Sequence, residues 1–219
     1  MPPDSNPAPE LSMPPTGDID LLVGIRAAQD DVTAVFRAMV DAVANPGRVL
    51  QLPVSGDCVP AVVLPALAIA DLRTPFIIVG DDDSRLARAL ARVSGAPFVH
   101  DITEARIVLV VDADAMDADV IWSLQVGTAH APENGSTVIV GCRRLDVAVE
   151  NQPGAILTTG PGAQDGRWFT ADGVGRSTVV DLDRVNSGYP AGIDLYLVDG
   201  GGRLVALPRS NRLRYEGAA

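Results

Sequence analysis

Four aspartates follow an apolar segment in the middle of the chain and could bind a divalent cation. Asp112, Asp114, Asp117 and Asp119 are spaced D-x-D-x-x-D-x-D directly after the run RIVLVV. The ends of strands are where α/β folds place their ligands, and carboxylate oxygens suit Mg²⁺. The spacing does not match a calcium loop, because no glycine stands at the sharp-turn position. Since acidic residues commonly cap helices, we interpret the cluster as a strand end followed by a helix start.

Two further polar groups allow the same pair of interpretations. The triplet from Asp81 to Asp83 could supply oxygen ligands, but it is typical of the first turn of a helix. His100 and His130 are the only histidines, and His130 lies near Glu133 in the turn-rich segment GTAHAPENG. This pair could act as a base or bind a metal. Because the two residues are only three positions apart on a loop and no third ligand is evident, we favour a structural or surface histidine.

A glycine-rich turn follows one of the expected strands. Thr158 to Gly162 reads TTGPG, and such turns can bind phosphate through backbone N–H groups. The proline removes one of these donors, and the residues that follow are not typical of a helix. We therefore expect a tight structural turn at this position.

The cysteines and one arginine pair complete the candidates for chemistry. Cys58 and Cys142 have no metal-site spacing and no histidine and aspartate nearby in the sequence, so nucleophilic catalysis has little support. The adjacent Arg143 and Arg144 could bind an anionic ligand or partner, although such pairs usually lie on a solvated edge.

The segment from Tyr189 to Asn211, YPAGIDLYLVDGGGRLVALPRSN, predicts a β-hairpin with polar ends. Residues 193–198 are apolar apart from Asp194, as in a strand buried on both faces. The DGGG segment forms the turn, and residues 203–207 form the return strand. A buried carboxylate requires a partner, and Arg209 lies just past the return strand. We therefore predict a structural Asp194–Arg209 pair across the hairpin.

All 17 basic residues of the chain are arginines. The lack of lysine excludes a pyridoxal-phosphate Schiff base, a Walker A phosphate loop and a lysine nucleophile or base. The net charge of −11 argues against nucleic acid and anionic membrane surfaces as partners. No apolar run reaches the length of a membrane span and no signal peptide is evident, so we expect a cytoplasmic protein with reduced thiols.

Hydrophobic periodicity and turn residues predict the remaining elements. The clearest helix covers residues 31–44, where apolar residues recur every three or four positions, Arg37 and Asp41 face outwards, and Asn45-Pro46-Gly47 ends the helix. Further helices are expected at 60–72, 81–93, 114–124 and 178–186, and strands at 48–52, 75–79, 97–100, 106–111, 137–140 and 155–159.

These elements predict one α/β domain and a tail. Residues 1–18 contain six prolines and little apolar sequence, which indicates a disordered tail. Residues 19–219 form a single domain, in which residues 211–219 are expected to fray. Strands alternating with helices and closed by a hairpin predict a three-layer α/β/α sandwich with a mixed sheet.

Five short segments form a combined pattern through their order and spacing. They are VFRAM through ANPGRV at 35–49, GTAHAPENGSTV at 127–138, LT with GPG at 157–162, YPAGIDL at 189–195 and LPRS at 207–210. From about residue 31 to residue 211 this pattern resembles the PhnH family, the H subunits of bacterial carbon–phosphorus lyase. The Pro-rich N-terminus departs from the compact pattern of that family.

The resemblance implies a fold similar to pyridoxal-phosphate-dependent transferases that has lost the cofactor site. It also implies a homodimer that joins the G, I and J subunits in a core complex. That complex makes a ribose 1-phosphonate 5-triphosphate from a purine nucleotide triphosphate and an alkylphosphonate such as methylphosphonate. The H subunit is required there, but catalysis is placed on the I subunit.

No catalytic residue, cofactor or metal follows from the resemblance, and the shared motif residues are expected to act as scaffold. The scaffold residues are Phe36, Arg37, Met39, Pro46, Gly47, Pro190, Gly192, Asp194, Pro208 and Arg209. Two other functions remain open. One is a free-standing metal-dependent enzyme acting on anionic substrates through Asp112 and Asp114. The other is a small-ligand binding module that uses the vestigial cofactor cleft.

Overall fold

The computed structural model describes residues 16–28, 31–53 and 59–217, and it begins with a helix that the sequence did not predict. This helix, α1, spans Thr16–Ala28. The expected tail lies almost wholly outside the described residues and therefore stays a prediction. Cys58 also lies outside them.

A six-stranded mixed sheet forms the centre of the molecule, in the order β1-β9-β8-β4-β3-β2. Its strands are β1 (Leu50–Gln51), β2 (Phe76–Val79), β3 (Ile107–Val110), β4 (Thr137–Cys142), β8 (Asp194–Asp199) and β9 (Arg203–Leu207). Strands β2, β3, β4 and β8 are parallel, while β9 runs antiparallel to both β8 and β1. The predicted α/β class, mixed sheet and terminal hairpin are confirmed.

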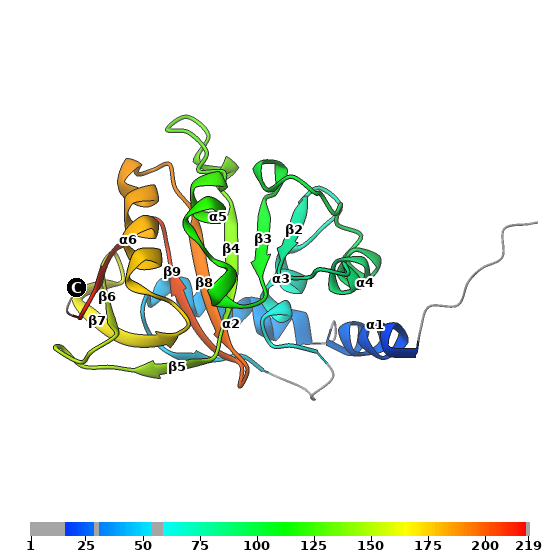
Figure 1. Ribbon diagram of the computed structural model, residues 1–219, viewed down its shortest axis with the longest axis horizontal. Helices are drawn as coiled ribbons and strands as arrows, with labels where there is room; N and C mark the ends of the chain where they lie inside the picture. The colour runs from blue at the N-terminus through cyan, green and yellow to red at the C-terminus, as the bar shows by residue number, and fades with distance from the viewer. Residues whose placement is uncertain (1–15, 29–30, 54–58, 218–219) are drawn as a thin grey trace, which may run out of the picture.

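Helices cover both faces of this sheet (Figure 1). One face packs against α2 (Val32–Ala44), α3 (Val63–Ile69) and α4 (Arg85–Ser94), with α1 packed against α4, and the other face packs against α5 (Ala118–Ser123) and α6 (Arg176–Val185). In β3, Ile107 and Leu109 point to the first face and Val108 and Val110 to the second. All four are buried, which explains why this strand is apolar throughout.

A second, four-stranded antiparallel sheet has the order β10-β6-β7-β5 and was not predicted. Its strands are β5 (Arg144–Val147), β6 (Ala155–Gly160), β7 (Ala163–Asp172) and β10 (Arg212–Tyr215). Leu145, Ile156 and Phe169 from this sheet are fully buried in the same core as α5 and α6. The second sheet therefore extends the core beyond the layers expected from the sequence.

The expectation that the chain frays after residue 211 is wrong, because β10 pairs along its whole length with β6. The sequence of β10, RLRY, alternates charged and apolar residues over only four positions. Such a short edge strand gains its stability from its neighbour rather than from its own propensity. Here that neighbour is β6, which is some fifty residues away in the sequence.

Several boundaries also differ from the expected ones. The apolar segment 60–72 forms only the short α3, and residues 97–100 contribute a single bridge between Phe98 and Phe76 instead of a strand. Helix α5 begins at Ala118 rather than at 114, because a short 3-10 turn, η3 (Ala113–Ala115), precedes it. None of the helices formed by the described residues is both long and apolar enough to cross a bilayer.

Candidate functional site

The predicted contact between Asp194 and Arg209 is present at the start of β8. The Arg209 guanidinium donates to Asp194 Oδ2 from Nη2 at 2.6 Å and from Nε at 3.1 Å, and the Arg209 backbone N–H donates to Oδ1 at 3.0 Å. The Arg209 side chain is 14% exposed. The guanidinium and the backbone N–H of Arg209 together bind both oxygens of the carboxylate, which makes a charge-assisted ion pair. The pair joins the start of β8 to the residues that follow β9.

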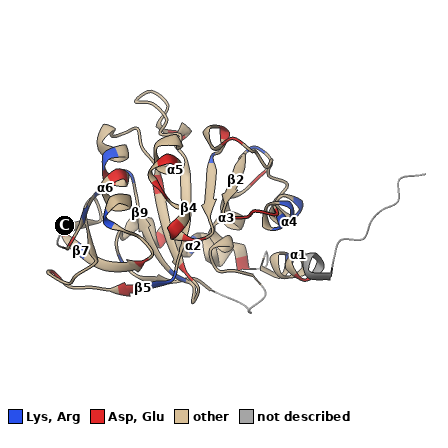
Figure 2. Ribbon diagram, in the orientation of Figure 1, with Lys and Arg blue, Asp and Glu red and all other residues tan. Residues whose placement is uncertain are grey.

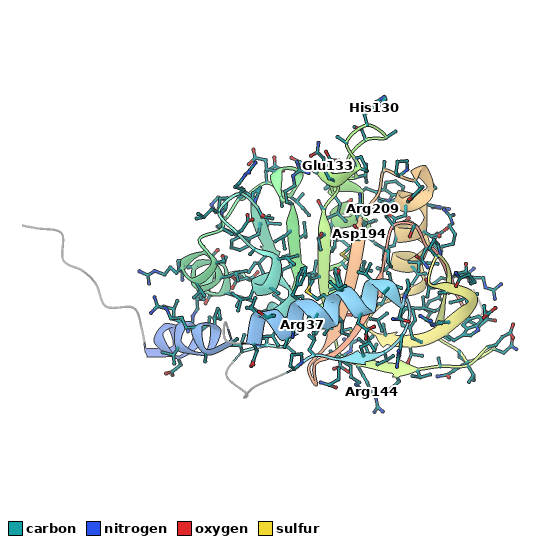
Figure 3. The ribbon with its side chains drawn as sticks, turned by 180° about the vertical axis from the view of Figure 1, so that it is seen from behind. Arg37, His130, Glu133, Arg144, Asp194 and Arg209 are labelled. Atoms are coloured by element: carbon teal, nitrogen blue, oxygen red, sulfur yellow. The ribbon has the colours of Figure 1, made fainter. Side chains whose placement is uncertain are left out.

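The same arginine also holds the loop that carries the two candidate site residues His130 and Glu133. Arg209 Nη1 donates to the Pro132 carbonyl at 2.6 Å, and Arg106 Nη2 donates to Asn134 Oδ1 at 2.6 Å. Figure 3 shows Asp194 and Arg209 together, with Glu133 nearer to the sheet and His130 at the tip of the loop. The loop is therefore fixed at its base and exposed at its tip.

Close backbone packing explains two glycines in the motifs of this region. A Cβ added at Gly135 would lie 2.2 Å from the Gly192 carbonyl oxygen, and one at Gly192 would lie 2.5 Å from Asn186 Oδ1. Asn186 is buried and exchanges hydrogen bonds with the backbone of Ile193. The GTAHAPENG and YPAG motifs thus meet in space and position the loop, as scaffold residues would.

The other end of the hairpin holds a second aspartate–arginine pair, which the sequence analysis missed. Asp199, treated there as part of the turn, has a side chain only 1% exposed. Its carboxylate accepts from the backbone N–H groups of Gly201, Arg203 and Leu145, and from Arg203 Nε at 2.8 Å. The bond from Leu145 ties the hairpin turn to the second sheet.

Arg203 extends this network to β5. Its Nη1 donates to Asp146 Oδ1 at 2.6 Å, and Arg144 pairs with the other oxygen of the same carboxylate. Hydrogen bonds from Arg144, followed by the hydrogen bond and charge of Arg203, hold the pKa of Asp146 below its ordinary value. Figure 2 shows acidic and basic residues interleaved around β5. Arg144 is thus an exposed arginine paired with Asp146, in keeping with the solvated edge that such pairs usually form.

The aspartates that follow β3 cap turns and form no metal centre. Asp112 Oδ1 accepts from the Asp114 backbone N–H at the start of η3, and Asp117 Oδ1 accepts from the Val120 N–H at the start of α5. Asp114 pairs with Arg143 at 2.8 Å. Among the residues that the structure describes, no three acidic, histidine or cysteine side chains gather as metal ligands would. The capping interpretation is confirmed, with Asp117 and not Asp114 capping α5.

A hollow of about 400 Å³ lies at the carboxyl ends of β3, β4 and β8. Its walls include residues 59–62, Asp112, Cys142, Arg143 and Asp199. Burial, and then the negative charges of Asp199 and Asp172, raise the pKa of the Cys142 thiol to about 12. The thiol is therefore protonated near neutrality and cannot serve as a nucleophile there. Arg143 is held by Asp114 and Asp172.

A groove of about 530 Å³ lies beside helix α2, at the amino ends of β3 and β4 and thus at the opposite end of these strands from the hollow. One wall is the apolar side of α2, where Phe36, Val40 and Val43 are 48%, 53% and 39% exposed. Arg73, Arg106 and Glu133 also line the groove. The groove is therefore largely apolar, with charged residues of both signs along it.

The remaining candidates have structural partners. Asp81 accepts a hydrogen bond from the Ala87 N–H in the first turn of α4. The ring of His100 packs edge-on against the ring of Phe98, with their centroids 4.8 Å apart. In the TTGPG segment the first three residues end β6, and Pro161 and Gly162 form the expected tight turn to β7. The segment packs against the end of α2, since a Cβ at Gly47 would lie 2.3 Å from Thr158 Cγ2.

Comparison with known proteins gives two matches that cover most of the chain. Residues 24–214 match the family model described as "Bacterial phosphonate metabolism protein (PhnH)". The chain is also similar to a protein of Stutzerimonas stutzeri described as "Putative C-P lyase subunit protein HtxG". The two are 26% identical over 186 residues, which cover 84% of this chain and 86% of that protein.

Proposed function

Since the chain belongs to the PhnH family of bacterial phosphonate-metabolism proteins, we propose that it is a required, non-catalytic subunit of a carbon–phosphorus lyase. In this role it supports the formation of α-D-ribose 1-methylphosphonate 5-triphosphate from a purine nucleotide triphosphate and methylphosphonate. It acts as a homodimer in the cytoplasm, together with the G, I and J subunits. Family membership over nearly the whole domain is the observation that carries this proposal.

The state of the candidate residues supports a non-catalytic role. Asp114 and Arg143 pair with each other, Cys142 is protonated, and His130 is exposed at a loop tip without a metal cluster in the described part of the chain. Catalysis needs a group whose protonation or nucleophilicity is free to act on substrate. These residues instead stabilise turns and joins between elements, as scaffold would.

The missing lysine is consistent with a transferase-like fold that no longer binds pyridoxal phosphate. A Schiff-base enzyme requires a lysine amine, and the chain has none. We include this fold relationship in the proposal, with the hollow at the carboxyl ends of β3, β4 and β8 as the place of the former cofactor site.

The test is a deletion of the gene in the source bacterium, followed by growth on methylphosphonate as sole phosphorus source. We expect no growth without the gene and full growth when a tagged copy is restored. Purification of that tagged copy should recover three further subunits in stoichiometric amounts, identified by mass spectrometry. Growth of the deletion strain, or recovery of the protein alone, would contradict the proposal.

The same hollow favours one second candidate, a small-ligand binding module. Its position at strand ends is where open α/β sheets bind ligands. Titration of the purified protein with ATP or methylphosphonate by calorimetry tests this function. The variant Gly200→Trp is a suitable control, because no atom lies within 4 Å of a Cβ added there. Heat in the native protein that this variant abolishes supports a ligand site, and the lack of heat counts against it.

A further inference from the structure

The groove beside α2 contains a buried tyrosine hydroxyl without a hydrogen-bond partner. Tyr196 of β8 lines the groove and is 9% exposed. In the described part of the chain no residue donates to or accepts from its hydroxyl, and the fully enclosed polar side-chain atoms that lack a partner are limited to Thr158 Oγ1. The Tyr196 hydroxyl therefore reaches the space of the groove, where a bound molecule could pair with it. A hydroxyl removed from water costs free energy unless it makes such a bond.

The tyrosine is also held in a fixed position and in the form that donates a hydrogen bond. It lies in the middle of the main sheet, opposite Ile139 of β4 and Ala206 of β9. Burial, and then the negative charge of Asp194, raise the pKa of Tyr196 to about 12, so the hydroxyl is protonated near neutrality. A rigid, protonated hydroxyl is a preorganised donor for an acceptor atom of a ligand.

One wall of the groove is apolar and extended. Phe36, Val40 and Val43 follow one another at spacings of four and three along α2, so they lie on one side of the helix, here called its open side. This wall is roughly 10 Å long, because an α-helix rises about 1.5 Å per residue. Val35 and Ala42, on the other side of α2, are buried against the main sheet. Figure 3 shows α2 lying openly across this face of the molecule, so the wall is accessible to an extended apolar group.

The charged residues that line the groove carry an excess of positive charge. Arg73 and Arg106 are opposed there by Glu133 alone, whereas the chain as a whole has a net charge of −11. Arg106 is fixed in place, since it donates to the Glu133 carbonyl and to Asn134 Oδ1. The Arg73 side chain makes no hydrogen bond or ion pair with the described residues, and its neighbour Asp71 accepts from backbone and hydroxyl groups. A ligand with one negative charge complements this lining.

We propose that this groove binds a small amphipathic carboxylate. Its apolar chain lies along the open side of α2, and its carboxylate accepts hydrogen bonds from the Tyr196 hydroxyl and the Arg73 guanidinium. A volume of about 530 Å³ and a largely apolar lining with few polar groups are typical of small-molecule sites. The site lies at the opposite end of β3 and β4 from the hollow, and it does not depend on the subunit role proposed above.

The first experiment compares two amphiphiles by titration calorimetry of the full chain. Decanoate and decyltrimethylammonium carry the same alkyl chain and opposite charges. We expect decanoate to bind at one site, and roughly tenfold or more tightly than the cation. The net charge of −11 attracts the cation to the protein as a whole. A preference for the anion therefore reports the local arginines and the tyrosine hydroxyl.

Removal of one oxygen atom tests the role of the tyrosine. Tyr196→Phe should raise the dissociation constant of decanoate roughly tenfold, because a hydrogen bond to a charged group is lost. The melting temperature of the unliganded variant should not fall, since the hydroxyl has no partner among the described residues. A purely structural hydroxyl would give the reverse pattern. Tyr215→Phe, on β10 and outside the groove, is the matched control and should bind decanoate as the wild type does.

Three charge variants test the position of the carboxylate. Arg73→Gln should weaken the binding of decanoate roughly fivefold, and Glu133→Gln should strengthen it, because the first removes an attractive charge and the second a repulsive one. Arg92→Gln is the matched control, since Arg92 is exposed on α4 and does not line the groove. Its dissociation constant should equal that of the wild type.

Three results would overturn the inference. They are the absence of heat with decanoate, equal binding of the anion and the cation, and a Tyr196→Phe variant that binds decanoate as tightly as the wild type. The absence of heat is also the result expected if a second copy of the chain or another protein covers the groove. These results concern only the groove, whereas growth on methylphosphonate tests the proposed function, so the two can fail separately.

Discussion

The two ends of the β8–β9 hairpin carry the same kind of ion pair in different surroundings. At one end Asp194 pairs with Arg209, and at the other end Asp199 pairs with Arg203. The Asp194 side chain is 35% exposed, and within the described part of the chain its carboxylate accepts only from Arg209. The Asp199 side chain is 1% exposed, and its carboxylate accepts from three residues, Leu145, Gly201 and Arg203.

The comparison shows that the cost of losing a carboxylate depends on which groups it leaves unpaired. Loss of Asp194, which is 35% exposed, leaves the guanidinium and one backbone N–H of Arg209 without this acceptor, but loss of Asp199, which is 1% exposed, leaves three backbone N–H groups and an arginine without theirs. A buried donor without an acceptor costs its full desolvation free energy, while an exposed one can bind water. The two ends also fix different parts: Arg209 holds the loop at Pro132, and Asp199 holds the second sheet at Leu145.

Asp199→Ala should therefore have the largest effect on stability. We expect the free energy of unfolding to fall by about 3 kcal/mol or more, because a buried, fully bonded carboxylate is removed and its donors remain. Urea denaturation measures the change. Asp165→Ala, at an exposed position on β7, is the control and should stay near the wild-type value. Equal effects at the two positions would show that the network at Asp199 is not important for stability.

Arg209→Ala should have the second-largest effect, of about 2 kcal/mol, because its side chain is 14% exposed and holds both Asp194 and the Pro132 carbonyl. The two variants should also differ in which segment of the protein opens locally. Amide hydrogen exchange should increase in residues 127–135 after Arg209→Ala, and in β5 after Asp199→Ala. An unchanged stability of Arg209→Ala would contradict the assigned role of the pair.

The reactivity of Cys142, which is buried and lies near Asp199, gives a third test of this end of the hairpin. With its pKa raised to about 12, the thiol should react with iodoacetamide at pH 9 several hundred times more slowly than in the unfolded chain, roughly in proportion to the thiolate fraction. The measurement uses a Cys58→Ser background, so that only Cys142 reacts. Fast alkylation of the folded protein would show that the thiol is neither buried nor shielded by negative charge.

Acid should weaken this end of the hairpin through Asp146. A carboxyl whose pKa is lowered in the folded state adds stability above its unfolded pKa of about 4 and loses it as the pH falls through the lowered value. We expect the drop in melting temperature between pH 6 and pH 3 to be smaller in Asp146→Asn than in the wild type. Asp165→Asn should retain the full drop, and the same drop in both variants would speak against a contribution from Asp146.

Local signals allowed much of the larger sheet to be predicted. Helix α2 and its end at Asn45-Pro46-Gly47 follow from three- and four-residue periodicity and from two residues that break helices. The Asp194–Arg209 contact was predictable because a hairpin brings together residues only fifteen positions apart. Asp199 was missed since a DGGG segment is a sufficient turn signal, and nothing nearby shows that its carboxylate binds Leu145.

The sequence by itself determined the parallel strands, the terminal hairpin, the capping aspartates and the exclusion of lysine chemistry, because each depends on periodicity, turn residues or composition. Only the tertiary structure decided the second sheet, the Asp199–Arg203–Asp146 network and the open side of α2. The network, for example, joins Arg203 to Asp146, which lies fifty-seven positions away in the sequence. Such contacts depend on which elements pack against each other in the folded chain, and no local sequence pattern encodes that outcome.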